Sequence, residues 1–229
     1  MRTPSDEAEL VARARALAGR SLEGLAREHG VTLGSVGRST KGKTGTLLER
    51  VLGATGGSSA TWDFPSLGVE LKTVPVDLRG VPRESTFVCT ISLRDADRAE
   101  WATSWARAKL RRVLWVPVLV LPDGSRRVAG ALLWSPTAAQ DVVLAQDFED
   151  IMGRIGAGEV EGLSGHAGRW LQVRPKAAHG RVRTAAPARD GGLLATVPRG
   201  FYLRALFTGA LLRDPVALPG RREGESSAG

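Results

Sequence analysis

The residues best suited to chemistry form one short pattern: Asp63, six intervening residues, and then Glu70 and Lys72 in a Glu-x-Lys triplet. Around Glu70 the side chains alternate with the period of two that is typical of a β-strand. Glu70 and Lys72 should therefore project side by side from one face of that strand. Pro65 and Gly68 precede it and favour a bend that returns Asp63 to the same edge. The sequence thus predicts two carboxylates and an ammonium group at one point.

Such a group of side chains suits the hydrolysis of a phosphodiester. The carboxylates of Asp63 and Glu70, with an intervening backbone carbonyl such as that of Leu71, are the hard oxygen ligands that Mg²⁺ prefers. A bound metal ion lowers the pKa of its water and neutralises charge that builds on the phosphate. Lys72 is suited to hold the attacking water or to stabilise that charge. We therefore treat the pattern as a candidate metal-dependent phosphodiesterase site.

The pattern resembles the Asp…Glu-x-Lys core of the restriction-endonuclease-like nucleases. Three residues alone leave a second interpretation open, because a solvated strand face that alternates Glu and Lys is common. Other parts of the chain are needed to choose between the two.

The composition favours a polyanionic partner. Lysine and arginine number 32 against 24 acidic residues in 229, which gives a net charge of +8 and a pI near 10.6. With one cysteine and three histidines, neither a disulfide framework nor a Cys/His zinc site is expected. No signal peptide and no apolar run of membrane-spanning length is apparent, so we expect a cytoplasmic protein that does not enter membranes.

The elements around the candidate site begin with a helical hairpin within residues 5–30. A further helix is expected from the spacing of Leu47, Leu48, Val51 and Leu52. Glu49 lies in this apolar stretch; it is either an exposed helix-face residue or a side chain directed to the metal site. The preceding KGKTG string lacks the rest of a phosphate-binding loop, but a helix start flanked by lysines suits DNA phosphate.

Further elements follow in order. We expect strands at 86–91, 113–120, 128–134 and 170–176, a helix from Ser135 to Gly156, and a last helix that residues 199–204 enter and that runs through Leu212. Phe87 is interpreted as core rather than as a base-stacking residue. The Arg/His/Ala-rich segment 176–189 is either a loop facing nucleic acid or a solvated charge run. Residues 215–229 are expected to form a flexible tail.

Several longer strings together resemble the MutH family of DNA mismatch-repair endonucleases. They are LLERVLGATGGS, DFPSLGVELKTVPVD, TFVC, KLRRVLWVPV, LLWSP, LQVRPKAA and RGFYLRALFTGALL, in family order from about Thr44 to Leu212. Ala102 departs from the pattern where an acid is expected, and 180–197 also diverges. The resemblance implies an α/β restriction-endonuclease-like fold. Residues 1–229 would form one such domain, with a central mixed sheet flanked by helices and two lobes forming a DNA-binding cleft.

The resemblance also implies roles for the residues of the candidate site. Asp63, Glu70 and the Leu71 carbonyl would bind Mg²⁺, and Lys72 would position or activate water. Glu49 would assist the metal site.

Lys109 would support catalysis close to the scissile phosphate. Six residues match DNA contacts of the family: Lys41, Phe87, Arg174, Pro175, Lys176 and Tyr202. Among them, the 174–176 loop would read DNA, and Tyr202 would lie near the adenine whose methylation is sensed. Lys41 would face a groove, and Phe87 would be an aromatic on the DNA side.

The activity implied by the resemblance is nicking of the unmethylated strand at hemimethylated GATC, 5′ of the guanine. The partners would be double-stranded DNA containing hemimethylated or unmethylated GATC, and MutL as an activator that uses ATP itself. Cutting one strand is consistent with a monomer. The alternative is a GATC-specific type II restriction endonuclease, which would cut both strands unaided. A catalytically inactive DNA-binding module is disfavoured by the intact Asp63, Glu70 and Lys72, and nucleotide binding is not expected.

Overall fold

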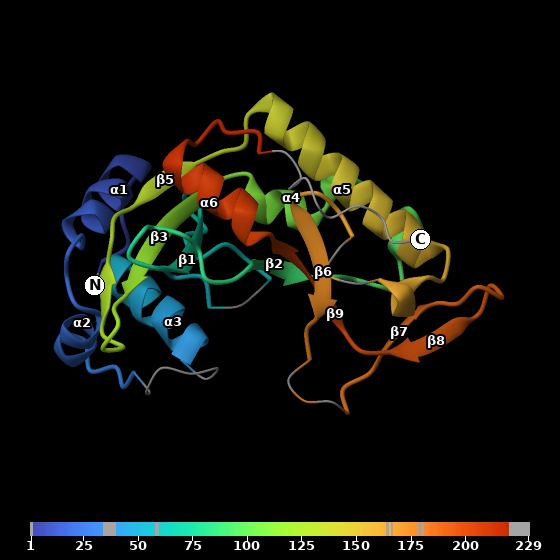
Figure 1. The fold of residues 1–229 in the computed structure, drawn as a ribbon, viewed down its shortest axis with the longest axis horizontal. Coiled ribbons are helices and arrows are strands. Elements are labelled where there is room, and N and C mark those ends of the chain that lie inside the picture. Colours follow the sequence, from blue (N-terminus) through green and yellow to red (C-terminus); the bar gives the residue numbers. More distant parts are fainter. Residues whose placement is uncertain are drawn as a thin grey trace. The chain divides into compact units, whose positions relative to one another are not determined.

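The computed structural model describes residues 2–33, 40–57, 60–163, 165, 167–177, 179 and 181–219, without the side chains of residues 40 and 41. The chain divides into two compact units, traced by the ribbon in Figure 1. Unit 1 comprises Met1–Glu84 and Lys109–Ser135, and unit 2 comprises Ser85–Ala108 and Pro136–Gly229. The division falls within the short helix α4 (Trp105–Leu110).

Unit 1 contains a mixed four-stranded sheet. Its strands are β1 (Glu70–Val76), β3 (Val113–Val120), β4 (Arg126–Val128) and β5 (Leu132–Trp134). Strand β3 is central: β1 pairs with it in parallel, whereas β4 and β5 pair with it antiparallel. The expected strand at 113–120 is confirmed; five of its eight residues are buried and three are partly buried, in keeping with its apolar sequence.

The single strand expected at 128–134 is wrong, because the segment forms two short strands. Strand β4 pairs with residues 118–120 and β5 with residues 113–115. Pro117 lies opposite the break and accepts a hydrogen bond from the Ala129 N–H at 2.9 Å, but it has no N–H to return. The antiparallel ladder is therefore interrupted at Pro117.

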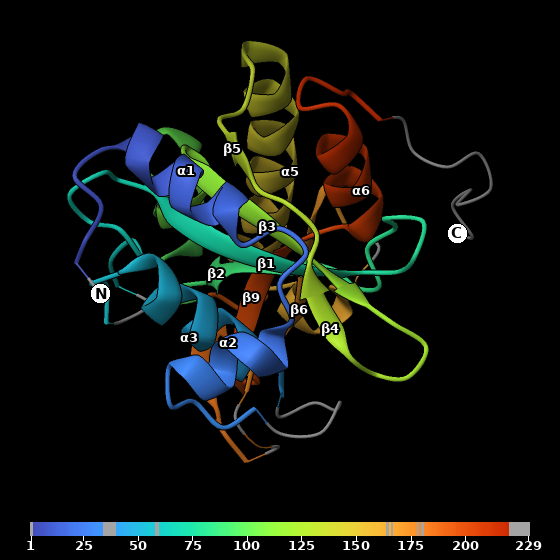
Figure 2. The ribbon, with the colours of Figure 1, turned by 90° about the vertical axis from the view of Figure 1, so that its left-hand side faces the viewer.

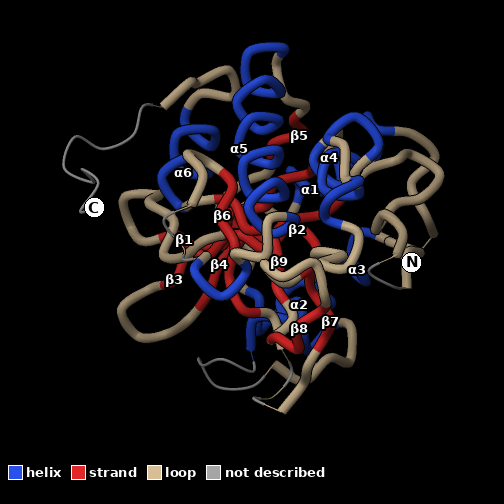
Figure 3. The backbone as a smooth tube through the Cα atoms, turned by 90° about the vertical axis from the view of Figure 1, so that its right-hand side faces the viewer, coloured by secondary structure: helices blue, strands red, loops and turns tan. Residues whose placement is uncertain are grey.

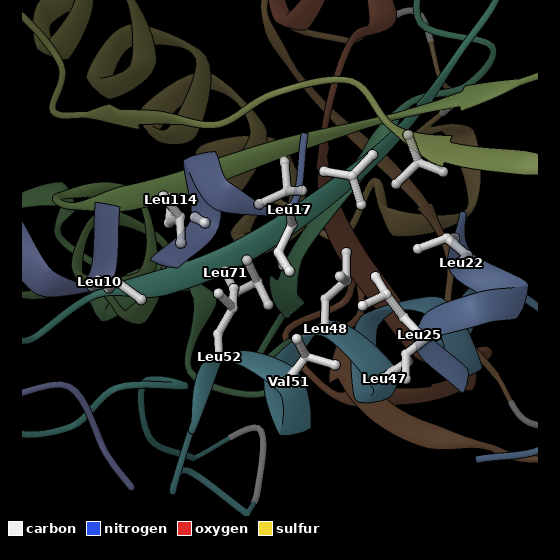
Figure 4. Close-up of a cluster of buried hydrophobic side chains, with 14 of the residues drawn as sticks. Leu10, Leu17, Leu22, Leu25, Leu47, Leu48, Val51, Leu52, Leu71 and Leu114 are labelled. Carbon is white, nitrogen blue, oxygen red and sulfur yellow. The ribbon is translucent and has the colours of Figure 1, made fainter. Parts of the chain in front are cut away.

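Three helices of unit 1 pack with this sheet through a leucine-rich core. They are α1 (Glu7–Ala16), α2 (Leu22–Glu28) and α3 (Thr40–Leu52), so the two helices expected within residues 5–30 and the helix carrying Glu49 are confirmed. The hairpin packing is wrong, because α1 and α2 each pack more against α3 than against each other. Figure 2 shows β1 and β3 side by side with these helices nearby. Figure 4 shows the core, in which Leu48 and Leu52 of α3 lie among the same side chains as Leu71 of β1. This packing fixes α3 against the strand that carries Glu70.

Unit 2 contains a three-stranded antiparallel sheet in the order β2 (Thr86–Thr90), β9 (Arg199–Leu203) and β6 (Leu171–Pro175). A separate hairpin is formed by β7 (Thr184–Pro187) and β8 (Leu193–Thr196), both visible in Figure 3. Part of the 176–189 segment is therefore a strand rather than loop. The last helix expected through Leu212 is confirmed as α6 (Ala205–Arg213), but the residues that lead into it form a strand, in which Arg199, Phe201 and Leu203 alternate inward.

The helices of unit 2 are α5 (Ala138–Gly156) and α6 (Ala205–Arg213), with short 3₁₀ turns at Ala96–Arg98, Trp101–Thr103 and Val160–Gly162. Helix α5 begins with a capping box between Thr137 and Gln140, one turn after the expected start at Ser135. The Gln140 amide also donates to the carbonyls of Pro215 and Ala217 at 3.0 Å. The first residues of the expected tail are thus bonded to α5, and residues 220–229 lie outside the described residues.

The chain therefore has the expected α/β fold, a mixed sheet flanked by helices. Within the described part of the chain, no helix is both long and apolar enough to cross a membrane.

Candidate active site

Asp63 is returned to the start of β1 by a tight turn. Phe64 and Val69 exchange two backbone hydrogen bonds of 3.0 and 3.3 Å, and Gly68 adopts φ +63°, which favours glycine. As a result, the Oδ2 atom of Asp63 accepts a 2.7 Å hydrogen bond from the Leu71 N–H. The bend predicted from Pro65 and Gly68 is present, and it brings Asp63 to the strand that carries Glu70.

Glu70 is held between two lysines. Its Oε1 atom accepts a 2.8 Å hydrogen bond from Lys72 Nζ, and its Oε2 atom accepts one of 2.7 Å from Lys109 Nζ. Lys109 comes from the last turn of α4 and also donates to the carbonyl of Thr61. Glu70 and Lys109 are only 4% and 3% exposed, so the carboxylate is compensated by paired ammonium groups rather than by water.

Glu49, on α3, lies within electrostatic reach of these acids. Burial is the largest cause that raises its pKa from 4.5 to about 7, and the charges of Asp63 and Glu70 add to the rise. The two lysines act in the opposite direction, with smaller effects. Glu49 is partly buried, which disfavours its alternative interpretation as an exposed residue on the helix face.

The pKa of Asp63 is also raised, first by burial and second by the negative charge of Glu70. The Leu71 N–H bond, Lys72 and Lys109 oppose this rise. Three carboxyl groups, those of Glu49, Asp63 and Glu70, therefore lie near only two ammonium groups, those of Lys72 and Lys109. An excess of carboxyl groups of this kind is typical of sites that bind a cation. No three His, Cys, Asp or Glu side chains of the described residues already lie at metal-ligand spacing.

Three of the candidate DNA contacts in unit 2, Phe87, Lys176 and Tyr202, lie close together. Tyr202 of β9 pairs in register with Phe87 of β2, and their rings meet edge to face with centroids 5.2 Å apart. The Lys176 ammonium lies 4.4 Å from the centre of the Phe87 ring. Phe87 is only partly buried, so its interpretation as a core residue is wrong.

Arg174 and Pro175 end strand β6 with exposed side chains. The Arg174 guanidinium receives support from Ser85, whose hydroxyl oxygen accepts a 2.8 Å hydrogen bond from Nη1. The remaining candidate, Lys41, lies in the first turn of α3, and its side chain is outside the described residues.

Sequence reasoning missed two contacts with these candidates. The Thr61 carbonyl under Lys109 and the Ser85 hydroxyl under Arg174 are 48 and 89 residues from the groups they bind. No local pattern links residues at such separations, and only the folded chain reveals them.

Comparisons with known proteins identify the family. The family model described as "DNA mismatch repair enzyme MutH" matches residues 52–147. The DNA mismatch repair protein MutH of Shewanella sp. (strain MR-7) is 45% identical over 212 residues, which cover 91% of this chain and 95% of the relative. Those of Serratia proteamaculans (strain 568) and Klebsiella pneumoniae (strain 342) are 45% and 46% identical, over 91% of this chain and 93% and 92% of theirs.

The chain belongs to the MutH family. It is accordingly a DNA mismatch repair endonuclease with the restriction-endonuclease-like fold of that family. The MutH family match over residues 52–147 includes Asp63, Glu70, Lys72 and Lys109. With Glu49, which lies outside the match, these residues are called the acidic cluster of unit 1.

Proposed function

We propose that this MutH-family endonuclease nicks the unmethylated strand of hemimethylated GATC sites, 5′ of the guanine, with Mg²⁺ and with activation by MutL. The observation that carries the proposal is that Asp63 is bonded to the Leu71 N–H beside Glu70, while Lys72 is bonded to Glu70 itself, in a chain whose relatives are mismatch repair proteins. Two acids and a lysine at one strand edge suit phosphodiester hydrolysis.

The donor atoms in unit 1 fit Mg²⁺ by their chemistry. Asp63 and Glu70 supply carboxylate oxygens, Leu71 supplies a carbonyl, and the raised pKa of Asp63 indicates a carboxyl group that a nearby cation would stabilise in its charged form. When bound, the ion would activate water and neutralise charge on the phosphate. In this proposal Asp63, Glu70 and the Leu71 carbonyl hold it.

The lysines and Glu49 have separate roles in the proposal. Lys72, whose side chain is 12% exposed, positions the attacking water and supports charge on the phosphate. Lys109 is buried, so it acts chiefly by holding Glu70 and supporting the phosphate side of the site. Glu49, with its pKa near 7, is suited to exchange a proton near neutral pH.

The sheet face of unit 2 is proposed to read the GATC sequence. Arginine pairs bidentately with guanine in the major groove, so Arg174 is suited to one of its G·C pairs. Methylation of adenine N6 removes a donor hydrogen and adds bulk, and Tyr202 is proposed to sense this change. Arg174 and Pro175 belong to strand β6 rather than to the expected 174–176 loop, so Pro175 would set the end of the strand beside Arg174. Lys176 and the lysine at position 41 add contacts to DNA in this proposal.

MutL, with its own ATP, is the proposed activator, and the nuclease is proposed to act as a monomer in the cytoplasm. Such a nickase should be nearly inert without MutL, whereas a type II restriction enzyme would cut both strands unaided.

The test uses three otherwise identical duplexes: hemimethylated GATC, unmethylated GATC and one that lacks GATC. Each is incubated with the full-length protein and Mg²⁺, with and without MutL and ATP. We expect nicks in the unmethylated strand of the hemimethylated duplex, nicks in either strand of the unmethylated duplex and none in the third, with nicking strongly increased by MutL. Double-strand cleavage without MutL, or equal nicking of all three duplexes, would refute the proposal.

A further inference from the structure

The face of the unit 2 sheet that carries the candidate DNA contacts has a gap in its row of side chains. In β9, Gly200 and Tyr202 are two residues apart and so share a face. Directly opposite them in β6 are Arg174 and Gln172, and Phe87 of β2 is opposite Tyr202. Cross-strand partners project to the same side of a sheet. Gly200 is therefore the one position without a side chain within this group.

The space above Gly200 is filled by its neighbours. A Cβ atom built on Gly200 would lie 2.9 Å from Cε2 of Phe87, 3.4 Å from Cβ of Lys176 and 3.2 Å from the carbonyl oxygen of Cys89. The ring of Phe87 and the stem of Lys176 thus occupy the volume that any other residue would take. Their cation–π contact, at 4.4 Å, forms over this glycine.

Backbone conformation does not account for the glycine. Gly200 is absent from the glycines of the described chain with positive φ, so other residues could adopt its backbone angles. Its position in β9 would ordinarily favour a larger side chain, because glycine weakens a strand interior. The close approach of Phe87, Lys176 and the Cys89 carbonyl is the remaining physical reason, and the Phe87 ring comes nearest.

We propose that Gly200 is a specificity-determining position, whose missing side chain seats Phe87 and Lys176 beside Tyr202 in the arrangement that reads the edges of DNA base pairs. This inference rests on the proposed recognition of GATC by this face. It adds a residue that touches no DNA itself but acts through Phe87. Alanine at this position displaces the ring, since 2.9 Å is shorter than carbon contacts normally allow, while a ring at the end of a side chain moves more readily than the strand.

The test is a double-mutant cycle with four full-length proteins: wild type, Gly200→Ala, Phe87→Ala and the double variant. For each, the Kd is measured in Ca²⁺ without nicking, on one duplex with GATC and one without. The ratio of the two Kd values reports specificity. Gly153→Ala is the matched control, because a Cβ there meets no described atom within 4 Å.

We expect Gly200→Ala to lower the specificity ratio about tenfold, the scale of one base-pair contact, while binding to the duplex without GATC stays within about twofold. In the Phe87→Ala background the clashing ring is gone, so adding Gly200→Ala should change the ratio less than about twofold. Gly153→Ala should leave the ratio unchanged.

An unaltered ratio in Gly200→Ala would overturn the inference, as would an equal loss in both backgrounds. If Gly200→Ala fails to fold, the double variant decides: its folding would support a clash with Phe87, and its failure to fold would place the clash at the Cys89 carbonyl and overturn the inference. A wild-type protein without preference for GATC would instead refute the proposed function.

Discussion

At the scale of single residues, the most unusual feature is a carboxylate enclosed by two ammonium groups. Glu70 is almost completely buried, and each of its oxygens accepts a hydrogen bond from a different lysine. Lys72 is two residues away on the same strand, whereas Lys109 arrives from α4. The two lysines differ in exposure, so their removal should have different consequences.

Replacing the more exposed lysine, in Lys72→Met, should lower the nicking rate by about 10²-fold or more, because the proposed support for water and phosphate charge is lost. Binding to the GATC duplex should change only a few-fold, since it depends on many phosphate contacts. Single-turnover nicking and a binding titration measure the two quantities. Arg79→Met, at an exposed turn of unit 1, is the control and should match wild type; equal rates in both variants would exclude Lys72 from the site.

The raised pKa of Glu49 predicts a pH-dependent stability. With a pKa of about 7 when folded and 4.5 ordinarily, the folded protein holds more protons than the unfolded chain between these values. Stability should therefore fall as pH rises through this window. Glu49→Gln, whose amide cannot ionise as pH rises, should raise the Tm at pH 8 in EDTA relative to wild type but not at pH 4. A Tm difference independent of pH would contradict the assigned environment of Glu49.

Local pattern predicted part of this site, and the fold supplied the rest. The period of two in the sequence predicts that Glu70 and Lys72 lie on the same face of the strand. Pro65 and Gly68 predict the turn that brings Asp63 near them. The contact between Lys109 and Glu70 spans 39 residues and depends on β3 running parallel to β1, so spacing alone could not reveal it. Phe87 was misjudged because an aromatic residue in a short apolar strand normally faces the core.

At the scale of elements, the loop between α3 and β1 holds the backbone of Asp63 in position. The N–H groups of Thr55 and Gly56 donate to the Asp63 carbonyl at 3.1 and 3.0 Å. A Cβ atom on Gly56 would lie 1.9 Å from the Trp62 carbonyl oxygen. Because this oxygen belongs to the backbone, no side-chain rotation can relieve the clash. The loop must therefore shift if this glycine acquires a side chain.

Gly56→Ala should accordingly reduce nicking by about tenfold to 10²-fold, because displacements of about 1 Å at a reacting centre have effects on this scale. Gly57→Ala should retain activity, since a Cβ there meets no described atom within 4 Å. Both variants are compared in single-turnover assays over a range of Mg²⁺ concentrations. Equal activity in the two would show that this loop does not position Asp63.

In unit 2, Asp147 of α5 anchors the start of β6. Its carboxylate accepts hydrogen bonds of 2.6, 2.6 and 2.8 Å from the N–H groups of Arg169, Trp170 and Leu171, and it is 6% exposed. Strand β6 then leads to Arg174 at the opposite end. This carboxylate therefore ties the longest helix of unit 2 to the strand that carries candidate DNA contacts.

Asp147→Ala should destabilise the protein by about 3–5 kcal/mol, since three N–H groups, two of them buried, lose a charged acceptor. Asp150→Ala, three residues later on the exposed side of α5, should change stability by less than about 0.5 kcal/mol. Urea unfolding measures both. A loss below about 1 kcal/mol for Asp147→Ala would show that other contacts hold β6.

Element boundaries were predicted well where one physical signal dominated. The apolar run of β3 and the leucine spacing of α3 are examples. Strand β9 was missed because its five residues adjoin a helix with no turn between them, so the helical pattern of α6 masked the strand's alternation. The split between β4 and β5 depends on Pro117 in a neighbouring strand, which no local window includes.

At the scale of the whole molecule, a net charge of +8 and membership of a DNA repair family agree on a polyanionic substrate. In the proposed function, the acidic cluster of unit 1 hydrolyses the phosphodiester, and the basic and aromatic side chains on the sheet of unit 2 recognise the GATC sequence. Charge alone supports affinity for any DNA, so neither the cutting nor the sequence preference follows from composition. Both depend on the few side chains described above.

Asp63→Asn tests the cutting site most directly, because the amide oxygen can still accept the Leu71 N–H while the charge proposed to hold Mg²⁺ is removed. The measurement is single-turnover nicking of a hemimethylated GATC duplex with Mg²⁺, MutL and ATP, beside a binding titration on the same duplex. We predict a loss of nicking of at least about 10²-fold with binding within a few-fold of wild type. Nicking at the wild-type rate would contradict the assignment of this cluster as the catalytic centre.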